Sequence, residues 1–354
     1  MTEDLFVIAE AGVNHNGSIN MAIELVDAAV EAGADAVKFQ TFRADRLASK
    51  NAAKAPYQEK STDQAESQFD MLKKLELTPE MHDALVKHCA KVGIEFMSTP
   101  FDEASARYLV EEVGVKRLKI PSGEITNAPY LLSLARLNVP LIVSTGMSSL
   151  EEVKEAVRII AFGFSHSEGA FDPNWRDDEV LSSFSSRLSL LHCTTEYPAP
   201  VSEVNLRAID QLRDSFPLPI GFSDHTEGIH IPLAAVGRGA VVIEKHFTLD
   251  RNLLGPDHKA SLEPAELTTM VKCLRDAYLA MGDGDKKPAS SEEKNIPIVR
   301  KSIVARTQIA VGDLLSAENL AVKRPGTGIS PMRWWDVIGT RATRNFDVDE
   351  LIEL

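Results

Sequence analysis

Two histidines give the sharpest chemical signal in the chain. His225 and His246 follow two short apolar runs, 220–223 and 241–245, which one helical segment separates. If these runs are neighbouring parallel strands, about 4.8 Å apart, both imidazoles can reach one cation. Two nitrogen ligands with room left for water and substrate oxygens suit Mn²⁺, Zn²⁺ or Co²⁺. A pair of hydrogen-bonded histidines without a metal fits this spacing equally well.

Serines and lysines at the ends of other apolar runs predict an anion site. These residues are Lys38, Lys119, Ser122, Ser144 and Ser223. Hydroxyls and exposed backbone N–H groups at such positions can hold a phosphate, with the lysines supplying charge. Each serine alone could instead cap a helix. A buried ammonium needs an anion or a carboxylate, so a structural pair with Glu10 or Glu124 is the alternative for the lysines.

Carboxylates at the same run ends could act as general bases or orient hydroxyl groups. They are Glu10, Glu124 and Asp257. The alternative is ion pairing with the lysines. Tyr197, between Glu196 and Pro198, could pack against a substrate or only against the protein.

The chemically active residues follow eight short apolar runs that alternate with helical segments. The runs cover 5–9, 36–40, 94–98, 117–120, 141–144, 188–192, 220–223 and 241–245. They are mostly apolar rather than alternating, as is typical of parallel strands covered on both faces. Eight strand–helix repeats predict an α/β fold, a (β/α)8 barrel with its active groups at the carboxyl ends of the strands. A doubly wound open sheet is the alternative, but the Gly-rich nucleotide turn that usually accompanies it is missing.

The remaining segments set the domain boundaries. The barrel is expected to cover 1–282, a polar linker 283–295, and a small separate domain 296–354. Two segments interrupt the barrel rhythm. Residues 43–75, after the second run, are expected to form a lid or substrate loop on the catalytic side. Residues 161–186 are expected to be a structural insertion on the opposite side.

Composition limits the classes of function and the compartment. The net charge of −14 argues against a nucleic-acid partner, which would need a basic face. No apolar run is long enough to span a bilayer, and the acidic start of the chain is unlike a signal peptide. Cys89, Cys193 and Cys273 form no CxxC pair, which favours reduced thiols over disulfides or a zinc site. A cytoplasmic protein is therefore expected.

Taken in order, the strand ends resemble the sialic acid synthase (N-acetylneuraminate synthase) family. The matching stretches are IAEAGVNHNGS, AVKFQTF, STPFD, LKIPSGE, STGM, HCTTEYPAP, GFSDHT, IEKHFTLD and GPDHKASLEP. In the tail, RKSIVA, VGDLLSAENL and VKRPGTGIS resemble the β-rich antifreeze-like (SAF) domain of the same family. The resemblance implies a TIM barrel followed by this small domain.

The resemblance also implies a reaction and a set of site residues. The family condenses phosphoenolpyruvate with an open-chain N-acyl mannosamine-type sugar, releasing phosphate and forming a nine-carbon α-keto acid. His225 and His246 match its metal ligands, for Mn²⁺ by preference and otherwise Mg²⁺ or Co²⁺. The residues that match its phosphoenolpyruvate contacts are Lys38, Thr99, Lys119, Ser122, Ser144 and Ser223. The residues that match positions around the sugar and the reacting carbons are Glu10, Gln40, Glu124, Tyr197 and Asp257. Arg324 matches an arginine that the small domain supplies to a partner's site in a domain-swapped homodimer.

Which sugar this chain uses is left open between two members of one class. N-acetylmannosamine is favoured, and 2,4-diacetamido-2,4,6-trideoxymannose, the substrate of legionaminic acid synthases, is the alternative. Thr195 stands where some members carry Asn, which puts one phosphoenolpyruvate contact in doubt. Two more distant hypotheses are a pyruvate-dependent metal aldolase and a non-enzymatic ice- or glycan-binding protein.

Overall fold

A computed structural model describes residues 5–49, 52, 54, 62, 66–176 and 180–354 of the chain. The chain divides into two compact units, Met1–Gly282 and Asp283–Leu354. Part of the segment 43–75 that was predicted as a lid lies outside the described residues, namely 50, 51, 53, 55–61 and 63–65. Within the described residues, no helix is both long and apolar enough to cross a membrane.

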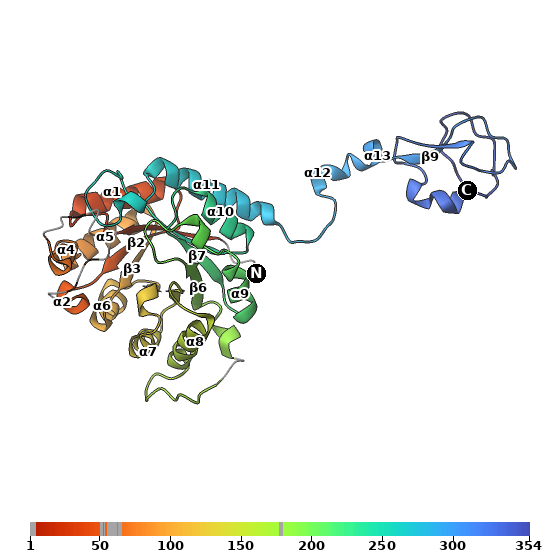
Figure 1. Cartoon of the computed structure of the whole chain (residues 1–354). Coiled ribbons are helices and arrows are strands. Elements are labelled where there is room, and N and C mark those ends of the chain that lie inside the picture. Colours follow the sequence, from red (N-terminus) through yellow and green to blue (C-terminus); the bar gives the residue numbers. More distant parts are fainter. Residues whose placement is uncertain (1–4, 50–51, 53, 55–61, 63–65, 177–179) are drawn as a thin grey trace. The chain divides into compact units, whose positions relative to one another are not determined.

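The first unit contains an eight-stranded, wholly parallel sheet (Figure 1). The strands run in the order β3-β2-β1-β8-β7-β6-β5-β4, and β3 lies next to β4, so the sheet closes into a barrel. The strands are β1 (Phe6–Gly12), β2 (Ala36–Thr41), β3 (Glu95–Pro100), β4 (Leu118–Ile120), β5 (Leu141–Ser144), β6 (Leu188–Cys193), β7 (Ile220–Asp224) and β8 (Val242–His246). The predicted (β/α)8 barrel is confirmed.

Helices follow the strands and surround the sheet (Figure 1). They are α1 (Ile19–Glu31), α2 (Ala44–Leu47), α4 (Gln68–Lys74), α5 (Pro79–Val92), α6 (Glu103–Tyr108), α7 (Ala128–Arg136), α8 (Leu150–Ser165), α9 (Ala208–Ser215), α10 (His230–Gly237) and α11 (Pro264–Met281). α8 begins with a capping box of Ser149 and Glu152. It continues to Ser165, so the first residues of the predicted insertion 161–186 are helical. The helix continues into this segment because Ala161 and Phe162 extend its buried apolar face.

The interior of the barrel changes from apolar to charged along the strands. Its floor is a separate apolar cluster of Ile8, Ala36, Met97, Ile142, Leu191 and Val242. Side chains on one face of a strand recur every second residue, so the next inward layer lies two residues further along. That layer contains Glu10, Lys38, Thr99, Ser144, Cys193 and Glu244. The alternation therefore gathers ionisable groups at the carboxyl end of the barrel.

The second unit is small and built around its own core. Its elements are α12 (Ser290–Glu293), α13 (Ile296–Val299), β9 (Ser302–Ala305), β10 (Leu320–Lys323) and α14 (Trp334–Val337). β9 and β10 pair antiparallel, and the apolar cluster beneath them includes Ile303, Leu320 and Phe346. β9 lies within the stretch RKSIVA, which resembles the SAF domain.

A buried ion pair on the outer side of the barrel joins β7 to β8. Asp224 and Lys245 are register partners, both side chains are fully buried, and Nζ lies 2.6 Å from Oδ2. Nζ also donates to the carbonyl oxygen of Thr226, whose N–H donates to Oδ1 of Asp224 at 2.9 Å. Each partner immediately precedes one of the two predicted metal-binding histidines, His225 and His246. The ion pair therefore fixes the ends of the two strands from which both imidazoles project.

We expect Asp224→Asn to lower the free energy of unfolding of the barrel by about 3–5 kcal/mol, because it leaves the Lys245 ammonium buried without a counter-charge. Urea unfolding followed by circular dichroism measures this loss. The double variant Asp224→Leu/Lys245→Met, which removes both charges, should lose less than the single variant. A single variant as stable as the wild type would show that the pair does not hold the strands together.

Candidate active site

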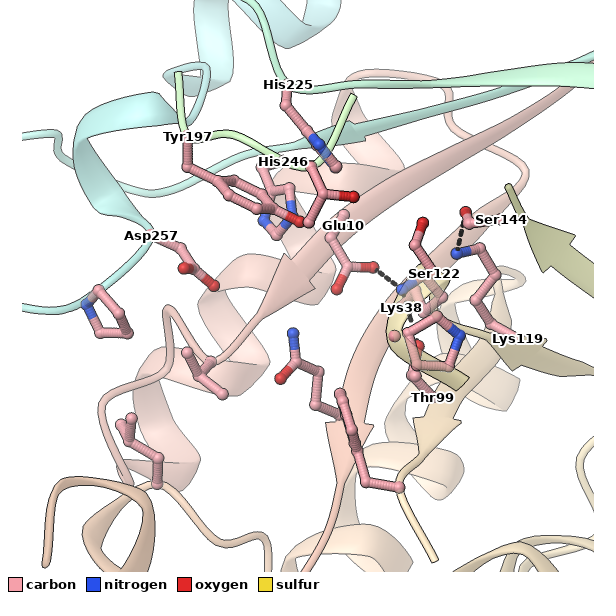
Figure 2. A pocket seen from close by; sticks show the side chains of 18 of the residues that line it. Glu10, Lys38, Thr99, Lys119, Ser122, Ser144, Tyr197, His225, His246 and Asp257 are labelled. Atoms are coloured by element: carbon pink, nitrogen blue, oxygen red, sulfur yellow. Dashed lines mark hydrogen bonds and ion pairs between the residues drawn. The ribbon is translucent and has the colours of Figure 1, made fainter. Parts of the chain in front are cut away.

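A cavity of about 340 Å³ opens at the carboxyl end of the barrel (Figure 2). Residues from or directly after all eight strands line it. The predicted site residues among them are Glu10, Lys38, Gln40, Thr99, Lys119, Ser122, Ser144, Tyr197, Ser223, His225, His246 and Asp257. The described part of segment 43–75 also lines the cavity, through residues of α2 and α4. The barrel thus brings together groups that are far apart in the sequence.

Four ionisable side chains form what we call the charged cluster: Glu10, Lys38, Lys119 and Glu244. All four are buried. Lys38 pairs with Glu10 and lies 3.5 Å from Oε2 of Glu244, while Lys119 lies 3.4 Å from Oε1 of Glu244. Glu244 therefore lies within reach of both lysines. The ion pair of Lys38 with Glu10 is drawn in Figure 2.

Hydroxyl groups complete the surroundings of the charged cluster. The Lys38 ammonium donates to Oγ1 of Thr99 at 3.0 Å, and the Lys119 ammonium donates to Oγ of Ser144 at 2.7 Å. The Ser223 hydroxyl donates to Glu244 at 2.7 Å. Two ammonium groups and three hydroxyls thus converge on one region, as the predicted anion site requires.

Burial and the neighbouring charges perturb the pKa values in this cluster. Burial raises the pKa of Glu10 to about 7, although the charge of Lys38 opposes this shift. Burial also acts to raise the pKa of Glu244, but the charges of Lys119 and Lys38 outweigh it and hold that pKa well below its usual value. Burial favours neutral Lys38, yet Glu10 and Glu244 raise the pKa of its ammonium. At neutral pH, Glu10 is therefore the carboxyl that can gain or lose a proton.

Asp257 and His246 approach Glu10 beside a glycine. At Gly12, which has φ +53°, an added Cβ would lie 3.3 Å from Oε1 of Glu10, 3.4 Å from Oδ2 of Asp257 and 3.5 Å from Cε1 of His246. The missing side chain leaves the space in which these groups meet. Burial raises the pKa of Asp257 to about 6, so it too can exchange a proton near neutral pH.

The two histidines lie side by side, with ring centroids 5.8 Å apart. Nδ1 of His225 donates to the carbonyl oxygen of Thr194 at 2.6 Å, which leaves the lone pair on Nε2. Nδ1 of His246 is buried and has no hydrogen-bond partner among the described residues. Burial lowers the pKa of His225 to about 4 and that of His246 well below its usual value, so both rings are neutral, the form that binds metals.

His225 and His246 are the groups that could ligate a cation here. Among the described residues, no group of three or more His, Cys, Asp or Glu side chains is placed to hold a metal ion. A cation bound by His225 and His246 would take its other ligands from water or substrate oxygens, as open catalytic sites do. The Tyr197 ring lies 4.1 Å from the ring of His225 and 5.7 Å from that of His246, which closes one side of this position (Figure 2).

Two predicted residues do not line the cavity. Glu124 lies in the short 3-10 helix Ser122–Glu124, where its carboxylate accepts a hydrogen bond from the side chain of Asn127 at 2.7 Å. The suggested pairing of a lysine with Glu124 is thus replaced by pairing with Glu244. Arg324 belongs to the second unit, where its Nε donates to the carbonyl oxygen of Val299 at 3.0 Å.

Glu244 is the residue that the sequence analysis missed. It lies within an apolar run, between Ile243 and Lys245, and was not singled out as a site residue. It precedes His246 by two positions, so both side chains face the same side of β8. That spacing was the signal that could have identified it.

Known proteins share both the sequence and the domain organisation of this chain. Residues 25–286 match the model of the NeuB family, and residues 300–353 match that of the SAF domain. The chain is 52% identical over 346 residues to an N,N'-diacetyllegionaminic acid synthase of Campylobacter jejuni, which covers 98% of each chain. It is 49% identical to the protein of the same description from Legionella pneumophila, over 96% of this chain and 91% of the relative.

A solved structure agrees with these matches. The crystal structure of the N-acetylneuraminic acid (sialic acid) synthetase of Leptospira borgpetersenii superposes with a TM-score of 0.69 at 33% identity, over 83% of this chain and 90% of that one. The resemblance that was read from the strand ends is confirmed. The chain therefore belongs to the NeuB family of sialic acid synthase-type enzymes, which condense phosphoenolpyruvate with a sugar, and it carries a SAF domain.

Proposed function

We propose that this enzyme condenses phosphoenolpyruvate with 2,4-diacetamido-2,4,6-trideoxymannose to give N,N'-diacetyllegionaminic acid and phosphate. The observation that carries the choice of sugar is the 52% and 49% identity to two legionaminic acid synthases over nearly the whole chain, against 33% to the sialic acid synthetase. The alternative from the sequence analysis thus replaces N-acetylmannosamine as the favoured substrate. The cytoplasm is the expected compartment.

The charged cluster and its hydroxyls would bind phosphoenolpyruvate. Lys38 and Lys119 would pair with the phosphate and carboxylate of the substrate, with hydrogen bonds from the side chains of Thr99, Ser122, Ser144 and Ser223. Ser122 already accepts a hydrogen bond from the N–H of Gly146 at 3.0 Å, which fixes its hydroxyl beside the cavity. These local groups would overcome the net charge of −14 on the protein.

The carboxyl groups would move the protons. In the reaction, C3 of phosphoenolpyruvate bonds to the aldehyde carbon of the open-chain sugar, water adds at C2, and phosphate leaves by C–O cleavage. Glu10, whose pKa lies near 7, would take the proton of the water that adds at C2 in those complexes in which its carboxyl is ionised. Asp257, close to His246 and Glu10, would supply a proton to the oxygen of the former aldehyde. Glu124 does not line this cavity, and its predicted catalytic role stays a prediction.

A divalent cation held by His225 and His246, Mn²⁺ by preference and otherwise Mg²⁺ or Co²⁺, would supply Lewis-acid polarisation of the sugar carbonyl. The buried lone pairs of two neutral imidazoles suit this role. Because no third His, Cys, Asp or Glu among the described residues joins them, coordination positions are left for substrate oxygens.

The second unit would act on the active site of a partner in a homodimer. It carries two strongly exposed apolar side chains, Met332 (87%) and Trp335 (81%), which suit a contact with another subunit. Arg324, exposed in the same unit, would contribute its guanidinium to the sugar.

The substrate assignment predicts a preference in steady-state assays of phosphate release with Mn²⁺. The value of kcat/KM for 2,4-diacetamido-2,4,6-trideoxymannose should exceed that for N-acetylmannosamine by about 10-fold or more. A preference for N-acetylmannosamine would make the enzyme an N-acetylneuraminate synthase. Turnover with pyruvate and without phosphate release would instead identify an aldolase.

The raised pKa of Glu10 predicts proton uptake when phosphoenolpyruvate binds. The anion competes for Lys38 and raises the pKa of Glu10 further, so affinity should be highest below about pH 7 and fall as the pH rises above that value. Calorimetry in buffers of different ionisation enthalpy measures this uptake. The Glu10→Gln variant, in which the ligand and Asp257 still titrate but residue 10 does not, is the control. Equal uptake in both proteins would contradict the assignment of this proton to Glu10.

The proposed role of Arg324 predicts that Arg324→Ala lowers kcat/KM for the sugar roughly 100-fold while the affinity for phosphoenolpyruvate stays normal. Arg306→Ala, at another exposed arginine of the same unit, is the matched control. Full activity of the Arg324 variant, or a monomer in sedimentation velocity at assay concentrations, would rule out the role across a dimer.

A further inference from the structure

One side of the cavity is apolar, in contrast to the charged cluster. We call it the apolar wall: Val13, Leu47, Met71, Leu72, Leu75 and Phe101, all of which line the cavity. Val13, Met71 and Leu75 belong to a small buried cluster with Phe42, distinct from the main core. Leu47, Leu72 and Phe101 pack against that cluster and stay partly exposed to the cavity. The apolar wall is therefore one continuous packed surface.

The residues of the apolar wall follow three neighbouring strands, β1, β2 and β3. They come later in the sequence than the inward polar residues of the same strands. Val13 follows Glu10 by three residues after β1, and Phe101 follows Thr99 by two at the end of β3. Leu47 ends α2, and the remaining residues lie in or next to α4, both in the connection after β2. The apolar wall thus lies toward the mouth of the barrel, while the charged cluster lies on the strands themselves.

Several contacts fix the apolar wall in place. The N–H of Ala44 donates to Oε1 of Glu76 at 2.7 Å, which ties the start of α2 to the residues after α4. Phe42 packs edge-on against Phe101, with ring centroids 5.9 Å apart. At Gly17, which has φ +73°, an added Cβ would lie 2.5 Å from the carbonyl oxygen of Lys74. α4 is thus seated against the loop after β1, and the wall has a defined shape.

We propose that the apolar wall selects the sugar by the substituents at C4 and C6, an inference that rests on the proposed function. The aldehyde carbon must meet phosphoenolpyruvate at Lys38 and Lys119, so the far end of the open-chain sugar extends toward the mouth and the wall. A 6-deoxy sugar with an acetamido group at C4 places methyl groups there. N-acetylmannosamine places hydroxyl groups against apolar side chains, where they lose water without gaining a partner.

The expected discrimination is moderate, because a hydrophobic surface rejects an added hydroxyl only weakly. Apolar pockets separate such analogues by about 10- to 100-fold. The preference should therefore depend on the apolar character of the wall and be lost in graded steps as the wall becomes polar.

The test uses three variants of the full-length enzyme and both sugars. Leu72→Gln makes a partly exposed residue of the wall polar, and Leu72→Met changes the shape of the side chain while keeping it apolar. Leu279→Gln is the matched control, since Leu279 is 78% exposed on α11 and does not line the cavity. Phosphate release at saturating phosphoenolpyruvate gives kcat/KM for each sugar, and thermal unfolding checks that each variant folds. Leu47→Gln is the second polar variant if Leu72→Gln does not fold.

We expect Leu72→Gln to lower the ratio of kcat/KM, diacetamido sugar over N-acetylmannosamine, about 10-fold, chiefly through a higher KM for the diacetamido sugar. Leu72→Met and Leu279→Gln should keep the wild-type ratio. A folded polar variant with an unchanged ratio would overturn the role of the wall while leaving the proposed function intact. A wild-type enzyme that prefers N-acetylmannosamine, or uses neither sugar, would overturn the proposed function itself.

Discussion

The structure depends on burying the charged cluster inside a barrel whose floor is apolar. Removing one charge from water costs several kcal/mol unless partners compensate, so the four groups must be held together as a set. Glu244 makes this possible because it lies between Lys38 and Lys119 and also accepts the hydroxyl of Ser223. The regular alternation of parallel strands places Glu10, Lys38 and Glu244 in one inward layer, and the Asp224–Lys245 pair fixes the neighbouring strand ends from outside.

The same cluster explains how an acidic protein can bind an anionic substrate. Glu10 and Glu244 raise the pKa of the Lys38 ammonium, and an anionic substrate would compete with these carboxylates for the lysines. Glu10, with its pKa near 7, can accept a proton when it loses Lys38. The cavity has a charged end and an apolar wall toward the mouth, and in our proposal the first binds phosphoenolpyruvate while the second selects the sugar.

Most of the fold followed from the sequence because each strand is a short apolar run with a polar residue at its end. The neighbouring positions of His225 and His246 and of the hydroxyl groups followed from the same rule. Glu244 was not identified as a site residue. A charge within an apolar run suggests an interruption of the strand unless it is known which face of the strand points into the barrel. Glu124 could not be placed from the sequence for a different reason: it follows β4 closely, but it lies in a 3-10 turn and binds the side chain of Asn127. The apolar wall could not be predicted, since its packing unites segments after three strands.

The most direct test of this account is the affinity for phosphoenolpyruvate of the Lys119→Met variant, measured by calorimetry. Lys116→Met, at an exposed position three residues earlier, is the control. If the charged cluster is the anion site, the Lys119 variant should bind phosphoenolpyruvate roughly 100-fold more weakly while the control binds normally. Wild-type affinity in a folded Lys119→Met protein would contradict the account, because the anion would then bind elsewhere.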